Sequence, residues 1–274
     1  MTTTVEGLTL RRKNIFAEAF EDVFRGAGYW RLWTALAWHA MRQRYRRSWI
    51  GIGWLGVSFA VFMTVKIFIF GGFMSSDMGY YAGHLTIGYL IYRLISNAVT
   101  GSCAVFVGAQ TWIKSEPLPL SVHVYKMMMN NFIIFAITAV PALAICAYVG
   151  AYNIMALVWL LPSLALYAFT TVCIGLLLGV ISARYRDIMH FSQTAMQVAY
   201  FLSPILWIPP ETGPRAMAAF LNPITHYVAL LRQPMLEGTI PLLSWVISLS
   251  CSLVIALLAI LFFATSRRKL IFWL

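Results

Sequence analysis

The sequence predicts an all-α integral membrane protein with six transmembrane helices. Of its 274 residues, 61% are hydrophobic, and the mean hydropathy is +0.77. Six apolar stretches are long enough to cross a hydrocarbon core, which needs roughly 20 helical residues, and none contains Asp or Glu. Backbone groups in lipid must pair within their own segment, so these stretches are expected to be helical. The predicted spans are residues 50–70, 85–107, 132–149, 154–181, 189–208 and 243–264.

The distribution of charge predicts the topology. The chain has 20 Lys and Arg against nine Asp and Glu, a net charge of +11. With a cytoplasmic N-terminus, 16 of the 20 basic residues lie in the cytoplasm, which is the bias that positive-inside insertion requires. We therefore expect both termini to be cytoplasmic, and the charge requires no nucleic-acid partner. The 16 residues are Arg11, Arg12, Lys13, Arg25, Arg31, Arg42, Arg44, Arg46, Arg47, Lys114, Lys126, Arg184, Arg186, Arg267, Arg268 and Lys269.

Two segments precede the first span. Residues 1–28 are polar and predict a mobile cytoplasmic leader, so residues 29–274 form a single transmembrane domain. Within that domain, residues 29–47 repeat apolar side chains at helical spacing but are too short and too basic to span. Trp30 on one side and Arg31 on another suit a helix lying in the headgroup plane. A soluble helix packed on a partner is the alternative.

Polar and aromatic side chains follow the helical period in two of the spans. In the second span they form one face, and Arg93 lies so deep that an unpaired charge there costs at least about 2.5 kcal/mol, which favours a wet pathway or a buried partner. In the fifth span, interhelical hydrogen bonding by the glutamines is the alternative. With aromatic residues of the first span, the two faces predict a lumen for a hydroxyl-rich substrate. Its predicted lining is Phe59, Phe62, Tyr89, Tyr92, Arg93, Ser96, Thr100, Gln197, Tyr200 and Trp207.

Lys66 is the second basic residue within the spans. It lies about one turn from the outer end of the first span, so we expect its ammonium group to reach the membrane surface.

The connection between the second and third spans is rich in apolar residues. Pro117 and Pro119 prevent one continuous helix, and Ser121 is a candidate N-cap for the next. Trp112 and Leu118 in a water-facing loop suggest a surface that another protein covers, although a simple turn is the alternative.

The external segment 209–241 is apolar but interrupted by six prolines. It predicts two short re-entrant helices at residues 216–221 and 224–232, with Asn222 and Pro223 as cap and first residue of the second and Gly238 ending it. An ordinary external loop would be more polar.

Motifs for chemistry are absent from the sequence. The chain has no His-Glu-x-x-His, Gly-x-Ser-x-Gly or Cys–His zinc spacing, and no Gly-Lys dipeptide from which a phosphate-binding loop could be built. The four cysteines fall within spans at spacings that match no metal or redox motif. We therefore expect no catalytic residue, no metal site and no bound cofactor, and any pumping must draw its energy from another subunit.

Three short motifs carry a family resemblance. Residues 44–56 read RYRRSWIGIGWLG, residues 183–188 read ARYRDI, and Ser203-Pro204, Asn222-Pro223 and Arg232 follow in order. Over about residues 29–270 the chain resembles the permease subunits of bacterial ABC transporters that export capsular polysaccharide, O-antigen and teichoic acid. That family typically carries RYxxSxLGxxW before its first span, and here Ile50 replaces the Leu.

The resemblance implies a homodimer in the bacterial inner membrane, with two ATP-binding cassette subunits that hydrolyse ATP with Mg²⁺ on its cytoplasmic face. It implies docking of those subunits on a loop and an outer gate formed by the re-entrant helices. The docking residues are Ser115, Glu116, Pro117, Leu118 and Pro119, and the gate residues are Asn222, Pro223, Tyr227 and Arg232.

The resulting functional hypothesis is the channel subunit of an ATP-driven exporter of lipid-linked polysaccharide. A permease for a small amphipathic drug or lipid is the first alternative. A membrane scaffold without transport is the second.

Overall fold

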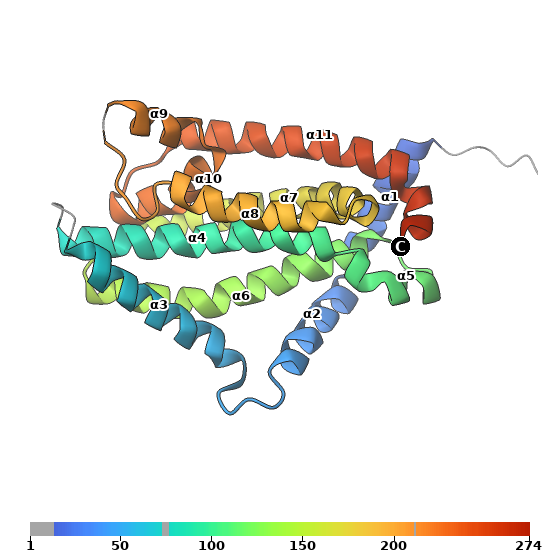
Figure 1. Ribbon diagram of the computed structural model, residues 1–274, viewed down its shortest axis with the longest axis horizontal. Helices are drawn as coiled ribbons and strands as arrows, with labels where there is room; N and C mark the ends of the chain where they lie inside the picture. The colour runs from blue at the N-terminus through green and yellow to red at the C-terminus, as the bar shows by residue number, and fades with distance from the viewer. Residues whose placement is uncertain (1–13, 73–76, 211) are drawn as a thin grey trace, which may run out of the picture.

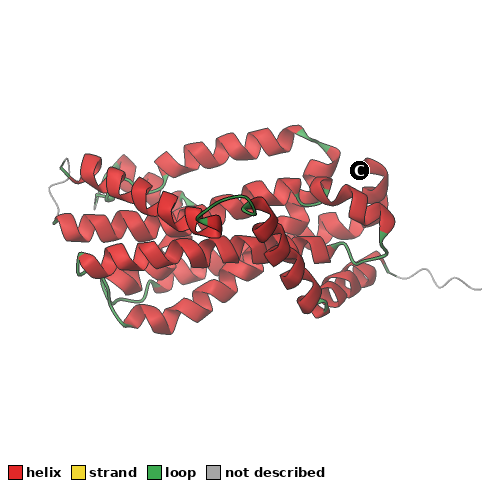
Figure 2. Cartoon of the chain, turned by 90° about the horizontal axis from the view of Figure 1, so that it is seen from below, coloured by secondary structure: helices red, strands yellow, loops and turns green. Residues whose placement is uncertain are grey.

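The computed structural model describes residues 14–72, 77–210 and 212–274, and all regular structure in them is helical (Figure 2). Short 3₁₀ turns lie at Gly51–Gly53 and Val107–Ala109. The α-helices are α1 (Ile15–Gly28), α2 (Trp30–Arg44), α3 (Trp54–Gly71), α4 (Met78–Ala104), α5 (Gln110–Ser115), α6 (Ser121–Tyr148), α7 (Met155–Arg184), α8 (Asp187–Leu202), α9 (Pro214–Leu221), α10 (Pro223–Leu236) and α11 (Leu242–Trp273).

The number of spans differs from the predicted six. Among the described residues, four helices are long and apolar enough to cross a membrane, and a fifth span results if α4 is joined to the helix that follows it at a bend of 57°. The predicted span 189–208 contains only α8, whose 16 residues end at Leu202. Ser203 precedes Pro204 and is extended, since a residue before proline disfavours helical backbone angles. Four or five spans are therefore supported, and six are not confirmed.

Helix α4 is the centre of the bundle, with α3, α6, α7, α8 and α10 packed around it (Figure 1). Helix α7 packs closely against the end of α4 and against α6, because it has glycines at these contacts. A Cβ on Gly179 would lie 2.6 Å from a Val105 methyl carbon, and one on Gly175 would lie 2.5 Å from a Val124 methyl carbon. Small residues four apart on a membrane helix permit this kind of close packing.

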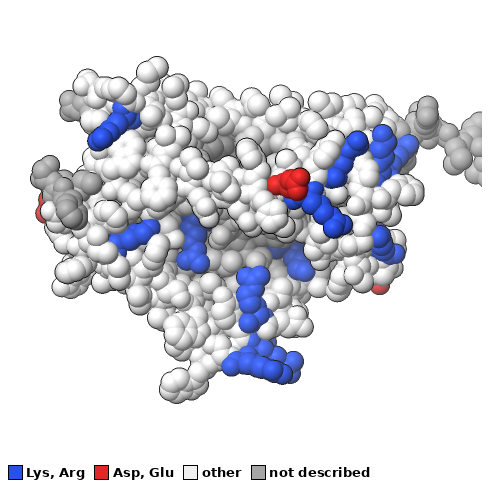
Figure 3. All heavy atoms as spheres, in the orientation of Figure 1, with Lys and Arg blue, Asp and Glu red and all other residues white. Residues whose placement is uncertain are grey.

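The two ends of the bundle differ. Helix α1, helix α5 and the C-terminus lie at one end in Figure 1, and α9 with the start of α4 lies at the other. Basic side chains on the face shown in Figure 3 gather mostly at the first end and along the end of α2. Both described chain ends thus share one end, as the predicted topology requires, and its assignment to the cytoplasm stays a prediction.

The prediction of a mobile polar leader is wrong for residues 15–28. These residues form α1, which Asn14 caps by accepting a hydrogen bond from the Phe16 amide (3.2 Å), and α1 packs on α6 and α11. Ala19 and Asp22 are buried in that contact. Residues 1–13 lie outside the described part of the chain.

Helix α2 occupies most of the predicted interfacial segment 29–47. It buries Ala37 and Met41 against α6, and Trp33 stacks on Tyr125 with ring centroids 5.8 Å apart. Trp30 and Trp38 stay exposed. Figure 1 shows α2 sloping away from the bundle until it turns back into α3. A position in the headgroup plane is not tested by these contacts.

Candidate functional site

Most of the predicted lumen residues line one groove between α3, α4 and α8, which we call the aromatic groove. It consists of two adjoining hollows of about 410 and 370 Å³ that share Phe62, Tyr89, Tyr92 and Ser96. The helical period explains the grouping, because residues three and four apart share a face. Nine of the ten predicted residues line it: Phe59, Phe62, Tyr89, Tyr92, Arg93, Ser96, Thr100, Gln197 and Tyr200.

Trp207 is the tenth predicted residue, and the structure does not bring it to the aromatic groove. It follows the break at Ser203–Pro204, and its indole N–H donates to the Phe201 carbonyl (3.1 Å). The helical spacing used for the prediction does not continue past Leu202.

The structure places the Lys66 ammonium group in the aromatic groove, and whether that position lies at the membrane surface is not tested. Its ammonium nitrogen lies 4.1 Å from the ring centre of Phe62, 4.3 Å from that of Tyr89 and 4.4 Å from that of Tyr200. It also donates a hydrogen bond to the Tyr200 hydroxyl. Three ring faces and a hydroxyl stabilise the cation inside the groove. Lys66 thus joins α3 to α8, a role that its position in the sequence did not indicate.

Tyr200 makes aromatic ring contacts with two tyrosines of α4. Its ring centre lies 5.8 Å from that of Tyr89 and 5.1 Å from that of Tyr92. The Tyr92 hydroxyl donates to the Met196 carbonyl, which anchors α4 to α8. Edge-to-face and tilted ring pairs of this kind contribute about 0.5–1.5 kcal/mol each beyond burial.

Arg93 lines the groove without a hydrogen bond or ion pair to any residue in the described part of the chain. The described lining carries two cations, Arg93 and Lys66, and no carboxylate. The remaining polar groups are hydroxyls and amides, including Asn97 and Gln193. Such a surface can hydrogen-bond hydroxyls, stack on sugar rings and attract anionic groups.

A separate cavity of about 440 Å³ lies on the other side of α4. Ile95, Ala98 and Val99 of α4 face it, together with residues of α7, α10 and α11, and Met196 of α8 lies between it and the aromatic groove. No charged side chain lines it, so it suits hydrocarbon and not a glycan.

The segment 209–241, predicted to be external, contains the two predicted short helices. Helix α9 is mostly exposed, whereas α10 is buried among α4, α7 and α11. Asn222 caps α10 by accepting from the Ile224 amide (3.0 Å), Pro223 is its first residue, and Gly238 follows its end with a φ of +67°. The cap and the stop are confirmed, and insertion of these helices into the membrane is not tested.

Arg232 connects α10 to two other elements. Its guanidinium donates to the Pro204 carbonyl (2.6 Å) and lies 3.3 Å from His84 Nε2 of α4. Only 8% of Arg232 is exposed. Asn222 reinforces the contact, since its amide donates to the Ser203 hydroxyl (2.8 Å). Arg232 and Asn222 thus hold the α8–α9 connection against α10.

Tyr227, also predicted at the gate, anchors α10 from its other side. It is 6% exposed, and its hydroxyl donates to the Ser248 carbonyl of α11 (3.0 Å). The Tyr167 hydroxyl of α7 donates in turn to the Tyr227 carbonyl (2.7 Å). Its contacts are with the bundle interior and not with an outer surface.

Replacing Arg232 with methionine is expected to destabilise the protein by about 1–3 kcal/mol, because the buried Pro204 carbonyl loses its charged donor and keeps only the contact with His84 Nε2 (3.1 Å). The measurement is thermal unfolding of the detergent-solubilised protein. Arg215→Met on exposed α9 is the control and should change little. Equal effects of the two substitutions would contradict the role of Arg232.

The predicted docking residues form a loop at the end that α1 and the C-terminus share. Ser115, Glu116 and Pro117 are exposed, Leu118 is partly exposed and Pro119 is buried. The loop is compact, since the Leu118 amide donates to the Glu116 carbonyl (2.8 Å). As predicted, no helix continues through the two prolines: α5 ends at Ser115 and α6 begins at Ser121.

Ser121 is not the cap of α6, which corrects that prediction. It is the first residue of α6, and its hydroxyl donates to the main-chain carbonyl of Asp22 (2.7 Å). The cap comes instead from the Asp22 carboxylate on α1.

Comparisons with known proteins agree with this architecture. Residues 31–236 match the family described as ABC-2 type transporter. The chain is also similar to the O-antigen export system permease protein RfbA of Myxococcus xanthus, with 22% identity over 222 residues. That alignment covers 78% of this chain and 85% of the relative.

Proposed function

The chain belongs to the ABC-2 type transporter family, and from this premise we propose that it is the channel-forming subunit of an ATP-driven polysaccharide exporter. The proposed cargo is a lipid-linked polysaccharide of O-antigen or capsule type, moved from the cytoplasm across the bacterial inner membrane. The similarity to an O-antigen export permease favours this cargo over a small amphipathic drug or lipid.

The aromatic groove is the observation that carries the proposal. It brings together rings, hydroxyls and amides from three helices that are otherwise apolar. Rings stack on the C–H faces of sugars, and the hydroxyls and amides pair with sugar hydroxyls. A small apolar drug would fit the cavity behind α4 better than this groove.

The proposed energy source is a partner subunit. Ion-coupled transporters usually carry carboxylates near the middle of the membrane. The described groove lining has none, and the sequence has no phosphate-binding loop. We propose that two ATP-binding cassette subunits dock on the loop Ser115–Pro119 and hydrolyse ATP with Mg²⁺, while this chain catalyses no reaction.

A second copy of the chain would close the groove into a channel. Helices α3 and α8 flank the groove, and both expose large apolar side chains, among them Val61, Phe68, Phe191 and Val198. Homodimerisation across this edge would cover those side chains and face two aromatic grooves toward one path. The short helices α9 and α10 then lie at its outer mouth and form the proposed gate.

A deletion strain tests the proposal. Surface glycan should disappear in the strain and return only when this chain and the partner ATPase are both supplied. Restored glycan without any ATPase would contradict the proposal, and loss of drug resistance with normal glycan would favour the drug permease.

Arg93→Ala separates a transporter from a scaffold. The substitution removes a groove cation that has no ion-pair partner in the described part of the chain. A contact between this cation and an anionic or polar cargo supplies roughly 1.4 kcal/mol, so we expect its loss to reduce export about tenfold. The amount of protein in the membrane should not change. Surface glycan labelling measures the effect, and Lys269→Ala at an exposed position of α11 is the control. A scaffold predicts no change for either substitution.

A further inference from the structure

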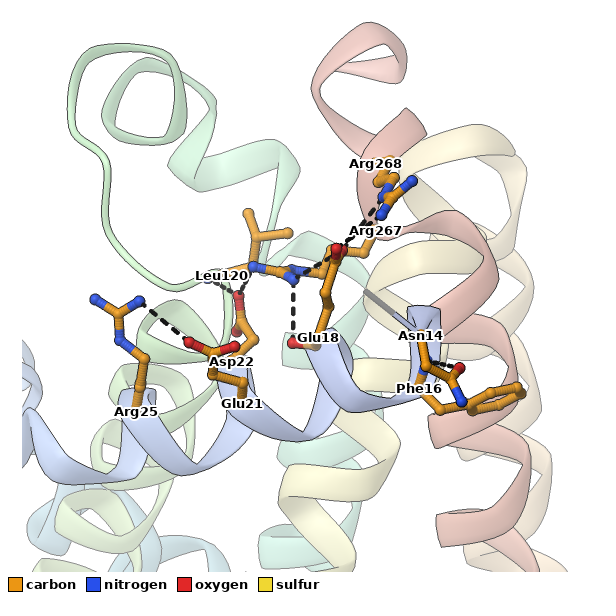
Figure 4. A network of polar contacts seen from close by, with 9 residues as sticks. All are labelled: Asn14, Phe16, Glu18, Glu21, Asp22, Arg25, Leu120, Arg267 and Arg268. Atoms are coloured by element: carbon orange, nitrogen blue, oxygen red, sulfur yellow. Dashed lines mark hydrogen bonds and ion pairs between the residues drawn. The ribbon is translucent and has the colours of Figure 1, made fainter. Parts of the chain in front are cut away.

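Helix α1 connects the docking loop to the last helix of the bundle. Figure 4 shows Asp22 pointing toward the start of α6 and Glu18 pointing toward Arg267 and Arg268 of α11. No sequence motif assigns a role to this helix, and the proposed docking and transport steps do not use it.

Asp22 is the centre of the network. Its carboxylate accepts from the Leu120 amide (3.2 Å) and the Ser121 amide (3.0 Å), and it pairs with the Arg267 guanidinium at 3.0 Å. Its side chain is 1% exposed. Helix α6 has no side-chain cap of its own, so a carboxylate from another helix satisfies the first amides and the positive end of the helix dipole.

The contact between α1 and α6 is close and specific. A Cβ on Gly26 would lie 2.0 Å from the Ser121 hydroxyl oxygen, so only glycine fits there. The Tyr125 hydroxyl donates to the Val23 carbonyl (3.2 Å) one turn further along α6. Helix α1 therefore cannot slide along α6 without breaking these contacts.

A second set of contacts fixes α1 to α11. Glu18 pairs with Arg268 at 2.7 Å, and Arg267 donates to the Glu18 main-chain carbonyl (3.1 Å) (Figure 4). Before the docking loop, at the start of α5, the Gln110 side-chain amide donates to the Leu274 carbonyl at the end of α11. The last turns of α11 thus hold both ends of residues 110–121, the segment that contains Ser115–Pro119. They contact the start of the segment directly at Gln110, and they hold its end through α1.

We infer that α1 positions the docking loop, and that Asp22 is the residue that fixes the loop's exit to both α6 and α11. This inference rests on the proposed function, because the loop's purpose is to receive the ATPase subunits. A hollow of about 320 Å³ between α1 and the loop, lined by Glu21, Arg25, Pro117 and Leu118 among others, places α1 on the same docking surface. Movement imposed on the loop by the ATPase then passes to two transmembrane helices at once.

Asp22→Asn tests the inference in the full chain. The substitution preserves shape but removes the charge that pairs with Arg267 and accepts two amides. We expect faster amide hydrogen exchange over residues 115–125 and about tenfold weaker binding of the purified ATP-binding cassette subunit. Arg267→Gln should act in the same direction, and the double variant should add less than the sum of the two. Glu237→Gln removes the same charge from an exposed residue that bonds Tyr80 near the start of α4, far from the docking loop, and should change neither readout.

The melting temperature of the Asp22→Asn variant shows whether Asp22 positions the docking loop or only stabilises the whole fold. A lower melting temperature with unchanged ATPase affinity per folded chain would overturn the inference, as would an equal effect of Glu237→Gln. If the wild-type chain binds no ATPase, the proposed function fails and this inference falls with it. Binding by the wild type with an unchanged affinity in Asp22→Asn overturns the inference alone.

Discussion

Replacing Glu116 with lysine and Leu118 with aspartate together is expected to abolish capture of the ATPase subunit and to stop export. Both residues lie on the exposed loop between α5 and α6, where α1 and α11 hold them in place. Residues at the centre of a protein interface commonly contribute 2 kcal/mol or more, which corresponds to about 30-fold in affinity for a single anchor. Co-purification of tagged ATPase from membranes measures the loss.

The control for this prediction lies at the opposite end of the bundle. Met217 of α9 is 65% exposed, and Met217→Asp introduces the same acidic group on an apolar surface away from the loop. It should leave ATPase capture intact. Retained capture by the loop variant would remove Glu116 and Leu118 from the docking role and leave the aromatic groove unaffected.

Tyr200→Ala is expected to reduce export at least tenfold without preventing membrane insertion. The ring contacts Tyr89, Tyr92 and Lys66, so its removal opens the groove where three helices meet. Contacts of this type contribute about 0.5–1.5 kcal/mol each, and roughly 1.4 kcal/mol corresponds to a factor of ten in rate. Pulse-labelling of surface glycan measures the rate.

Two further variants define what Tyr200 contributes. Tyr200→Phe keeps the ring contacts and loses only the hydrogen bond from Lys66, so its effect should be smaller than that of alanine. Phe262→Ala removes an aromatic ring of α11 that is 41% exposed and lies outside the groove lining, so it should leave export unchanged. Equal export by Tyr200→Ala and wild type would exclude the groove as the path.

The groove was predictable from sequence because it depends on local periodicity. Tyr89, Tyr92, Arg93 and Ser96 share a face of any helix that contains them, whatever surrounds it. The breaks at Pro117, Pro119 and Pro223 were predictable for the same reason, since proline restricts the backbone at its own position. The boundary at Ser203–Pro204 follows the same rule, and overlooking it led to the overlong fifth span and to Trp207 as a lumen residue.

Contacts between distant segments were not predictable. Lys66 and Tyr200 are 134 residues apart, and no local pattern connects them. Asp22 and Ser121 are 99 apart, so the cap of α6 could not be read from the residues near it. Helix α1, in contrast, could have been predicted from the residues near it. Asn14 precedes apolar residues at Ile15, Ala19 and Val23, a helical repeat with a good N-cap.

Reconstitution of the purified chain into vesicles tests the central claim, that this chain is a passage driven by nucleotide hydrolysis in another subunit. Alone, with an imposed proton or sodium gradient, it should move no lipid-linked glycan uphill. Adding the ATP-binding cassette subunit with Mg²⁺ and ATP should start accumulation. Uphill accumulation by the chain alone under an ion gradient would contradict the claim.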